Sequence, residues 1–331
     1  MRAARLHHPS PIEQRPLVVE AVPSPQPGPG ELLLEVHVCG LCHTDLHIAE
    51  GEVKPQGYPL IPGHQVVGRV IGLGPGAEGW QIGQRAGMTW LFRADGTCEF
   101  CKRGQENLCP AAEFTGLDRP GGFAEYVVAD AAYALPLPDA MTDEQAAPLL
   151  CAGIIGYRSL RQAGLEPGQR LGLVGFGASA HLAIQVARHW GCQVYVFTRN
   201  QQHQALARDL GAAWAGQAED EPPEALDCAV IFAPAGALVP TILGKLRPGG
   251  TLAINAIHLS PIPEMDYQLI YGERTLRSVA NLTRQDGQEF LAMAAEIPIR
   301  PTVRAYGLDE LNEALIDMKT SRIDGAGVIR L

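Results

Sequence analysis

The sequence predicts an α/β protein in which a mostly-β region of short strands precedes a doubly wound parallel sheet. The length of 331 residues is sufficient for two ordinary domains, each with its own core. Near residue 150, short apolar runs broken by glycine and proline give way to alternating strand and helix patterns. A glycine-rich turn at residues 175–180 also lies between a predicted strand and a predicted helix.

The first half holds apolar runs that are typical of short strands. They are Leu32–Val38, Gln65–Leu73 and Ala124–Ala129, and the first of them follows the turn signal Pro27-Gly28-Pro29-Gly30. Because each run is bounded by turn-forming residues, this region is expected to be mostly β.

From Arg170 onward the chain alternates between strand and helix patterns. The expected strands are Leu171–Val174, Val194–Phe197, Asp227–Phe232 and Thr251–Asn255, and the expected helices are Ala178–Trp190, Gln201–Leu210, Leu238–Leu246 and Leu308–Lys319. Strands that alternate with helices imply a parallel sheet covered by helices on both faces.

Composition narrows the functional class. The 26 Lys+Arg against 36 Asp+Glu give a net charge of −10, and an acidic chain without a basic run is a poor candidate for binding nucleic acid or an anionic membrane. No apolar stretch follows Arg2 and Arg5, and no run of roughly 18 apolar residues is present, so a cytoplasmic location is expected. In a reducing compartment, the eight cysteines indicate metal binding or catalysis rather than disulfides.

The segment Gly175-Phe176-Gly177-Ala178-Ser179-Ala180 matches the pattern GxGxxA. Gly175 would make the tight turn, Gly177 would let a pyrophosphate approach the backbone, and Ala180 would let the helix pack closely on the strand. The helix N-terminus would supply N–H donors to the anion. The alternative is an ordinary strand–helix turn, but the surrounding βα units favour a dinucleotide-binding turn.

The next predicted strand ends in Phe197-Thr198-Arg199, where an acidic residue would bond the ribose 2′-hydroxyl of NAD(H). Thr198 would not repel a 2′-phosphate and Arg199 could pair with one, which slightly favours NADP(H) over NAD(H). Alternatively, Arg199 is solvated or stacks on adenine, and either cofactor is usable.

Two groups of residues are candidate zinc ligands. Cys98, Cys101 and Cys109 lie within one loop at a spacing typical of zinc sites, and Asp95, three residues before Cys98, is a candidate fourth and harder ligand. The alternative for this loop is a lost site, empty or closed by a Cys98–Cys101 disulfide.

The second group, Cys42, His64 and Cys151, fits a catalytic zinc that keeps one position open. These three residues are far apart in the sequence, so spacing alone is a weak signal, and a single histidine such as His64 is more often structural.

Together these segments resemble the zinc-dependent alcohol dehydrogenases of the medium-chain dehydrogenase/reductase superfamily, over nearly the whole chain. The resemblance is carried by Cys39-Gly-Leu-Cys42-His-Thr-Asp45-Leu-His47, Pro62-Gly63-His64, the Cys98–Cys109 loop, Gly121-Gly122-Phe123-Ala124-Glu125-Tyr126, Cys151-Ala-Gly and the GxGxxA turn, in that order. It implies a GroES-like, mostly-β catalytic domain of residues 1–152 and 281–331, with a Rossmann domain of residues 153–280 inserted between them.

The resemblance also implies an activity: reversible hydride transfer between a small primary or secondary alcohol, or its aldehyde or ketone, and NAD(P). Cys42, His64 and Cys151 would bind the catalytic zinc, and Asp45 would orient His64. Thr44 would hydrogen-bond the substrate oxygen and His47 would take its proton onward. Trp90 falls where the family places an aromatic residue of the substrate pocket. Relatives form dimers and tetramers, so a homo-oligomer is expected.

Three departures from the family pattern carry expectations of their own. Gln65 replaces the glutamate that usually follows the zinc histidine, and Asp95 replaces the first cysteine of the loop. Asp324 stands where an arginine often faces the cofactor pyrophosphate, so either Asp324 turns away or Arg322 substitutes, and weaker cofactor affinity is expected.

Two rival functions follow from the same residues. One is a zinc-free quinone or enoyl reductase, and the other is a silent or weakly active, zinc-stabilised nucleotide-binding protein. The remaining cysteines, Cys39, Cys192 and Cys228, are predicted to be buried small hydrophobic residues.

Overall fold

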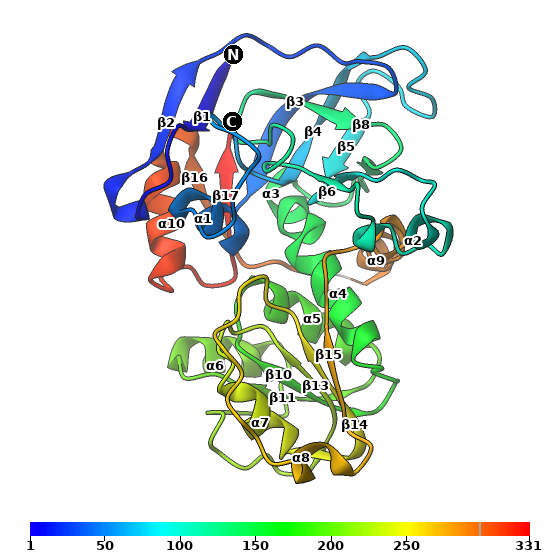
Figure 1. Cartoon of the computed structure of the whole chain (residues 1–331), viewed down its shortest axis with the longest axis vertical. Helices are drawn as coiled ribbons and strands as arrows, with labels where there is room; N and C mark the ends of the chain where they lie inside the picture. Colours follow the sequence, from blue (N-terminus) through cyan, green and yellow to red (C-terminus); the bar gives the residue numbers. More distant parts are fainter. Residues whose placement is uncertain (298) are drawn as a thin grey trace. The chain divides into compact units, whose positions relative to one another are not determined.

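The computed structural model describes residues 1–297 and 299–331 and divides the chain into two units. The first unit comprises Met1–Cys151, Asn281–Glu296 and Arg300–Leu331, and the second comprises Ala152–Ala280 and Ile297–Ile299. Figure 1 shows that the blue and cyan N-terminal segments of the first unit lie beside the red C-terminal segments. The first unit is therefore built from both ends of the chain.

A seven-stranded sheet organises the first unit, in the order β16-β17-β3-β4-β5-β9, with β8 also paired to β3. Its strands are β3 (Glu31–Gly40), β4 (Gln65–Leu73), β5 (Arg85–Met88), β8 (Tyr126–Asp130), β9 (Leu135–Pro136), β16 (Val303–Gly307) and β17 (Ala326–Arg330). The pairings are antiparallel except for the parallel pair β16 and β17. Alternate residues over most of β3 are buried, as expected where one face of a strand packs on a core.

Shorter elements complete the first unit. They are the hairpin sheets β1 (Arg2–Leu6) with β2 (Leu17–Ala21) and β6 (Leu91–Arg93) with β7 (Glu113–Phe114), the helices α1 (His43–Glu50), α2 (Glu99–Lys102), α3 (Asp143–Ala146), α9 (Arg284–Glu296) and α10 (Leu311–Lys319), and the 3-10 turns η1 (Ile12–Gln14), η2 (Glu106–Leu108), η3 (Ala147–Leu150) and η4 (Leu308–Glu310). Leu6, Leu32, Ile48 and Phe123 are fully buried in the core that these elements enclose.

The second unit contains a six-stranded sheet, and every neighbouring pair of its strands is parallel. Its strands are β10 (Arg170–Val174), β11 (Gln193–Phe197), β12 (Trp214–Gly216), β13 (Leu226–Ile231), β14 (Leu246–Ile254) and β15 (Thr275–Ser278), and its helices are α4 (Ala152–Gln162), α5 (Ala178–His189), α6 (Gln201–Asp209), α7 (Leu238–Leu243) and α8 (Gln268–Tyr271). The order β12-β11-β10-β13-β14-β15 is that of a Rossmann sheet, with the first strand in the middle. The predicted fold class is confirmed.

Some boundaries differ from those that the sequence predicts. Helix α7 ends at Leu243, before the predicted Leu246, because Leu246 already begins β14 by pairing with Leu226. A register shift follows before Thr251 pairs with Cys228, so the apparent turn at residues 247–250 lies inside the strand. Strand β15 is mostly exposed and β12 has three residues, so neither carries the apolar run that marks a strand in sequence.

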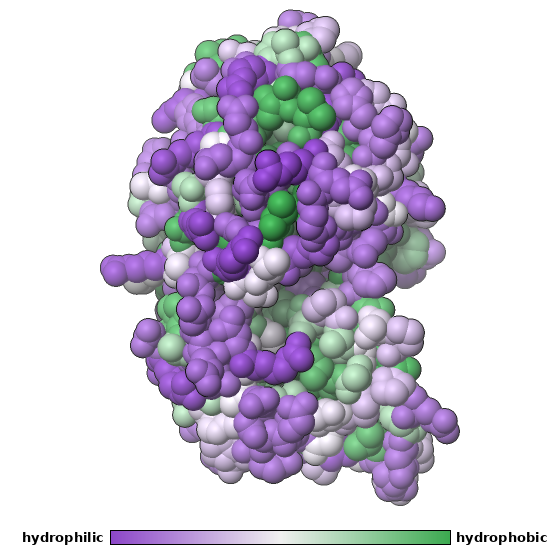
Figure 2. Space-filling view, turned by 90° about the vertical axis from the view of Figure 1, so that its left-hand side faces the viewer, coloured by the Kyte–Doolittle hydropathy of each residue, from purple (hydrophilic) through white to green (hydrophobic). Residues whose placement is uncertain are grey.

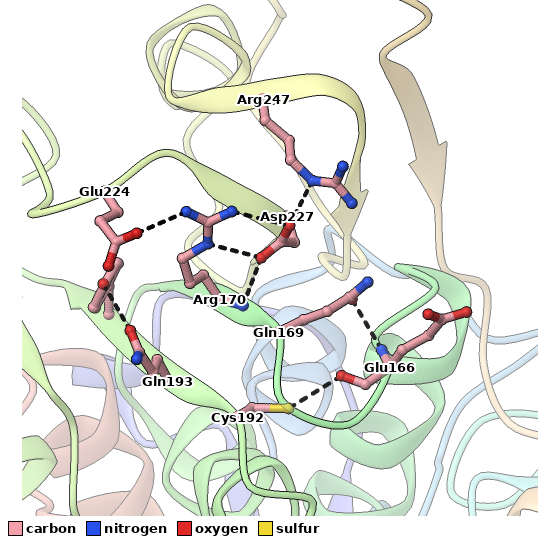
Figure 3. Close-up of polar contacts among 9 residues, drawn as sticks. Glu166, Gln169, Arg170, Cys192, Gln193, Glu224, Asp227 and Arg247 are labelled. Atoms are coloured by element: carbon pink, nitrogen blue, oxygen red, sulfur yellow. Dashed lines mark hydrogen bonds and ion pairs between the residues drawn. The ribbon is translucent and has the colours of Figure 1, made fainter.

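Charged residues link the amino ends of three strands in the second unit (Figure 3). Asp227 in β13 accepts hydrogen bonds from Arg170 N at 2.8 Å and from Arg170 Nε at 2.9 Å, and its other oxygen lies 2.5 Å from Arg247 Nε in β14. Burial raises the pKa of Asp227, but the hydrogen bonds from Arg170 outweigh it and hold that pKa below its ordinary value. We call Arg170, Asp227 and Arg247 the strand-start cluster.

Hydrophilic residues dominate the face shown in Figure 2, where hydrophobic residues form small separate areas. None of the helices in the described parts of the chain combines enough length with enough apolar character to cross a membrane. Cys39, Cys192 and Cys228 are at most 2% exposed, which confirms the prediction that they are buried. All eight cysteines are free, so the structure contains no Cys98–Cys101 disulfide.

Candidate functional site

The structure brings Cys42, His64 and Cys151 together within the first unit. One potential ligand atom from each residue lies within 4.8 Å of those of the other two. Cys42 directly precedes α1, His64 directly precedes β4, and Cys151 follows η3, so three segments that are distant in sequence meet at one point. Two sulfur atoms and one imidazole nitrogen form a donor set that zinc prefers, and three ligands leave a fourth tetrahedral position for another molecule.

Asp45 fixes the orientation of this cluster from a buried position in α1. Its Oδ2 accepts a hydrogen bond from Cys42 N at 2.9 Å, and its Oδ1 accepts one from Gly63 N at 3.1 Å. The same Oδ1 lies 3.4 Å from His64 Nδ1. A carboxylate beside one ring nitrogen leaves the other nitrogen, Nε2, as the atom that could bind a metal ion.

The chemistry of these groups fits a divalent cation. Burial lowers the pKa of His64, but the Asp45 carboxylate and the Cys42 thiolate outweigh it and raise that pKa to about 10. A hydrogen bond from the Cys151 thiol holds the pKa of Cys42 well below its usual value, and the same bond raises the pKa of Cys151. A metal ion that binds these groups therefore displaces protons from His64 and Cys151.

His64 supplies an independent test of the fit. Its side chain is 1% exposed, and neither ring nitrogen has a hydrogen-bond partner among the described residues. An unpaired buried polar atom is costly, and Asp45 lies beside Nδ1 only, so Nε2 is the atom that lacks a hydrogen-bond partner within the described part of the protein. A metal ion at Nε2 would provide such a partner.

Glycines shape the loop that presents His64. Gly63 has φ +96°, and a Cβ there would lie 2.9 Å from Cys39 Sγ and 2.9 Å from Phe123 N. Gly122 N donates to Gly63 O at 2.8 Å, which ties the Gly121-Gly122 segment to the same loop. These contacts explain why glycine is needed at Gly63 and how the Gly121-Gly122 segment is held beside the His64 loop.

Thr44 and Trp90 lie beside the cluster. Thr44 is 6% exposed, and its Oγ1 is 3.5 Å from Cys42 Sγ. The Trp90 ring meets the His64 ring edge to face at a centroid distance of 5.0 Å and stacks on Phe114 at 5.2 Å. Aromatic rings therefore form one wall around the candidate ligands.

Helix α1 also carries His47, whose Nδ1 contacts the carboxylate of Glu52. Sequence analysis singled out His47 but missed Glu52. The available signal was Gly51, a helix-ending residue between the two, because the turn after a helix brings its next residues back beside its last turn.

Gln65, which replaces the usual glutamate, is 1% exposed and binds the backbone beside Cys42. Its Nε2 donates to Leu41 O at 2.9 Å, while its Oε1 has no hydrogen-bond partner among the described residues. Gln65 thus links the start of β4, next to His64, to Leu41, the residue before Cys42.

The second candidate metal group is also assembled in the first unit. Asp95, Cys98, Cys101 and Cys109 each offer a ligand atom, and these atoms all lie within 4.8 Å of one another. Asp95 Oδ1 accepts hydrogen bonds from Thr97 N at 2.7 Å and from Cys98 N at 2.9 Å. The backbone bond from Cys98, with that from Thr97, lowers the pKa of Asp95, so the carboxylate is ionised. Three sulfur atoms and one carboxylate oxygen can close a tetrahedral site.

The GxGxxA turn follows β10 and opens α5 in the second unit. Gly175 has φ +84°, and a Cβ there would lie 3.0 Å from Ala233 N. A Cβ on Gly177 would meet nothing within 4 Å, so its backbone faces open space, and Ala180 is fully buried. The turn therefore offers an accessible backbone at a helix N-terminus, as a pyrophosphate site requires.

Thr198 and Arg199 follow the end of β11. The Thr198 backbone is held by bonds from its N–H to Gly216 O and from Gln204 Nε2 to its carbonyl, each 2.8 Å long. The Arg199 side chain is exposed. Its guanidinium is therefore accessible to a phosphate.

Arg322 and Asp324 lie between α10 and β17 in the first unit. Arg322 Nε donates to Asp317 Oδ1 at 2.8 Å, and Arg322 Nη2 lies 2.7 Å from the same oxygen. Asp324 is exposed. The guanidinium of Arg322 is thus engaged by Asp317 within its own unit.

Comparison with known proteins assigns both units to one family. The family model described as "Alcohol dehydrogenase GroES-like domain" matches residues 28–139, and the model described as "Zinc-binding dehydrogenase" matches residues 180–296. "Probable alcohol dehydrogenase AdhA" of Mycobacterium tuberculosis is 46% identical over 335 residues, which cover 99% of this chain and 97% of that protein.

Solved structures agree with this assignment. A cinnamyl alcohol dehydrogenase from Sorghum bicolor superposes with a TM-score of 0.91 at 28% identity, covering 99% of this chain and 97% of the other. The enzyme named CAD from Helicobacter pylori, solved with NADP(H), superposes with a TM-score of 0.89 at 25% identity, covering 100% and 99% of the two chains. The chain belongs to the alcohol dehydrogenases of the medium-chain dehydrogenase/reductase superfamily.

Proposed function

We propose that this alcohol dehydrogenase depends on zinc and interconverts small primary or secondary alcohols with their aldehydes or ketones, using NAD(P). The observation that carries the proposal is the convergence of Cys42, His64 and Cys151 within 4.8 Å, with Asp45 behind the imidazole. We further propose the bounds 1–152 and 281–331 for the catalytic domain and 153–280 for the dinucleotide-binding domain.

Cys42, His64 and Cys151 would hold the catalytic zinc, which supplies a Lewis acid to the alcohol or carbonyl oxygen. The protein's own part is to keep the three ligands in place. Asp45 does so by bonding the backbone of Cys42 and by lying beside the imidazole. The rings of Trp90 and Phe114 restrict water on one side and favour an apolar substrate.

Thr44 and His47 are proposed to move the proton that is released when an alcohol is oxidised. The Thr44 hydroxyl accepts the proton of the substrate hydroxyl as it passes its own proton on, and His47 acts as the general base at the end of this route. The nicotinamide ring of the bound cofactor would take the hydride.

Asp95, Cys98, Cys101 and Cys109 are proposed to bind a second, structural zinc. Asp95 uses one carboxylate oxygen for the backbone of its own loop, as its bonds from Thr97 N and Cys98 N show. The second oxygen then remains for the metal. This site would crosslink the loop without an open position for substrate.

The turn formed by Gly175, Gly177 and Ala180 is proposed to bind the cofactor pyrophosphate. The exposed side chain of Arg199 next to Thr198 supports a slight preference for NADP(H) over NAD(H).

Metal analysis joined to kinetics tests the proposal. We expect about two zinc ions per chain, from one closed and one open site, and cofactor-dependent oxidation of short alcohols. Cys42→Ala should lose one zinc ion and abolish turnover.

Cys228→Ala is the matched control, since this buried thiol lies in the second unit and in neither ligand group. It should keep both metal ions and native turnover. Two zinc ions without turnover across a panel of alcohols and aldehydes, tried with both cofactors, would identify a silent family member instead.

A further inference from the structure

The carboxylate of Glu52 is held against the imidazole of His47 by the way helix α1 ends. Gly51 takes up the left-handed conformation with φ +84°. The chain then reverses so that Glu52 N and Val53 N donate to His47 O at 2.8 and 3.1 Å. These backbone bonds place Glu52 beside the last turn, where its Oε2 contacts His47 Nδ1.

This contact selects one tautomer of the His47 imidazole. An ionised carboxylate can only accept hydrogen bonds, so a neutral His47 bound to it carries its proton on Nδ1 and presents its lone pair on Nε2. The ring is oriented at the same time, because Nδ1 points at Glu52. A base that takes a proton at Nε2 is therefore prepared before substrate arrives.

The two side chains differ in their access to solvent. The His47 side chain is 16% exposed, whereas that of Glu52 is 45% exposed. The pair thus connects a partly buried imidazole to a carboxylate that water can reach more easily.

We propose that Glu52 is the positioning residue of the proton route and its outlet to solvent, an inference that rests on the role proposed for His47. As Nε2 accepts the proton released by the alcohol, Nδ1 passes its own proton to Glu52, and Glu52 releases it to water. One proton enters and one leaves, so His47 ends neutral with its remaining proton on Nε2, and exchange of that proton with water restores the Nδ1–H form before the next turnover.

Asp45, Glu13, Glu50 and Lys319, which lie on or around α1, pair with groups other than His47. His43, on the same helix, has its ring centroid 6.5 Å from that of His47. Among the elements packed against α1 are η1 and α10. Lys319 of α10 lies 2.8 Å from Glu50 and 2.9 Å from Glu13 of η1, so these charges pair with one another. Asp45 faces His64.

A double-mutant cycle on alcohol oxidation tests the inference. Glu52→Gln should lower kcat about 10-fold near pH 7 with little change in KM, the lower end of the 10- to 100-fold loss seen when the hydrogen-bond partner of a metal-ligating histidine is removed. The deficit should narrow as pH rises, because hydroxide can then accept the proton directly. In a His47→Gln background, Glu52→Gln should cause no further loss.

Glu50→Gln is the matched control. It removes the same charge from a glutamate two residues earlier, at the end of α1, but Glu50 binds Ile12 N and Lys319 rather than His47. Its pH profile should equal that of the native enzyme. The inference would be overturned if Glu52→Gln showed the same dependence of kcat on pH as the native enzyme. It would also be overturned if the losses of kcat from His47→Gln and Glu52→Gln multiplied in the double variant.

Nitrogen-15 NMR of labelled histidine gives a readout that needs no turnover. Native protein should show His47 as the Nδ1–H form, and Glu52→Gln should show a mixture of both forms, because an amide can either donate or accept. A native Nε2–H form would refute the mechanism.

Failure of this inference can be told from failure of the proposed function. If His47→Gln oxidises alcohol at the native rate, both the proton route and the role of Glu52 are overturned. If His47→Gln is slow while Glu52→Gln is as fast as native enzyme at every pH, only the role of Glu52 falls.

Discussion

Replacing Asp45 by asparagine should loosen the catalytic metal site in a way that the structure allows to be worked out. The carboxylate serves three donors: Oδ2 takes Cys42 N, while Oδ1 takes Gly63 N and lies beside His64 Nδ1. An amide keeps only one acceptor. The less costly orientation leaves its oxygen at the Oδ1 position and turns its NH2 group toward Cys42 N.

The expected magnitude follows from that orientation. One buried backbone N–H is left without a partner, which costs about 1–3 kcal/mol of folding free energy. The opposite orientation would lose two partners and cost more. Because His64 then faces a neutral group and the backbone of Cys42 is less firmly held, zinc affinity should fall about 10- to 100-fold.

Competition with a chromophoric chelator measures the zinc affinity, and urea unfolding measures the stability. Asp227→Asn is the matched control: it alters a carboxylate, 10% exposed, that bonds a backbone N–H, but it lies in the second unit. This control should lose stability while binding zinc as the native protein does. An Asp45→Asn variant that holds zinc as tightly as the native protein would refute the reasoning.

Four further outcomes are expected. Asp95→Ala should lower the zinc content from two ions per chain to one, whereas Asp95→Cys should retain both, as metal analysis will show. Arg199→Asp should reduce the ratio of kcat/KM for NADP(H) over NAD(H) by at least about 10-fold, and an unchanged ratio would exclude Arg199 as the reader of the 2′-phosphate. Because hydrogen bonds from Arg170 hold the pKa of Asp227 below its ordinary value, the stability that Asp227 supplies is complete above about pH 4 and is lost as pH falls further. The urea midpoints of native protein and Asp227→Asn should therefore differ at pH 7 and converge in acid. Asp324→Arg should tighten cofactor binding in a titration, and equal dissociation constants would show that Asp324 does not affect the pyrophosphate.

The second unit was predictable because its signals are local. A strand, the Gly175–Ala180 turn and a helix follow one another in the sequence, and repeated βα units allow a parallel sheet. Strand β15 carries no such signal, since its residues are mostly exposed and its pairing with β14 defines it. Partners far away in the chain, rather than local pattern, determine such edge strands.

The two candidate metal groups also differ in how local their sequence signals are. Cys98, Cys101 and Cys109 share one loop, so their spacing alone indicated a metal site. The grouping of Cys42, His64 and Cys151 was weak on spacing alone, because three separate segments carry them, and resemblance to a family supplied the stronger support.

Two contacts escaped sequence analysis for a related reason. Glu52 reaches His47 only because Gly51 reverses the backbone after α1, a property of three-dimensional geometry rather than of spacing. Asp227 is likewise 57 residues from Arg170, and only the alignment of parallel strands brings them together.

The strand-start cluster has a consequence for local unfolding within the second unit. It binds β10, β13 and β14 at their amino ends, whereas the Gly175–Gly177 turn leaves β10 at its carboxyl end. In hydrogen exchange, amides beside Arg170 and Asp227 should open only with the whole sheet, while those of the turn exchange through local fluctuations. Cofactor binding should then slow exchange selectively at the turn. The turn could then change conformation when a ligand binds, while the strand-start cluster keeps the sheet folded.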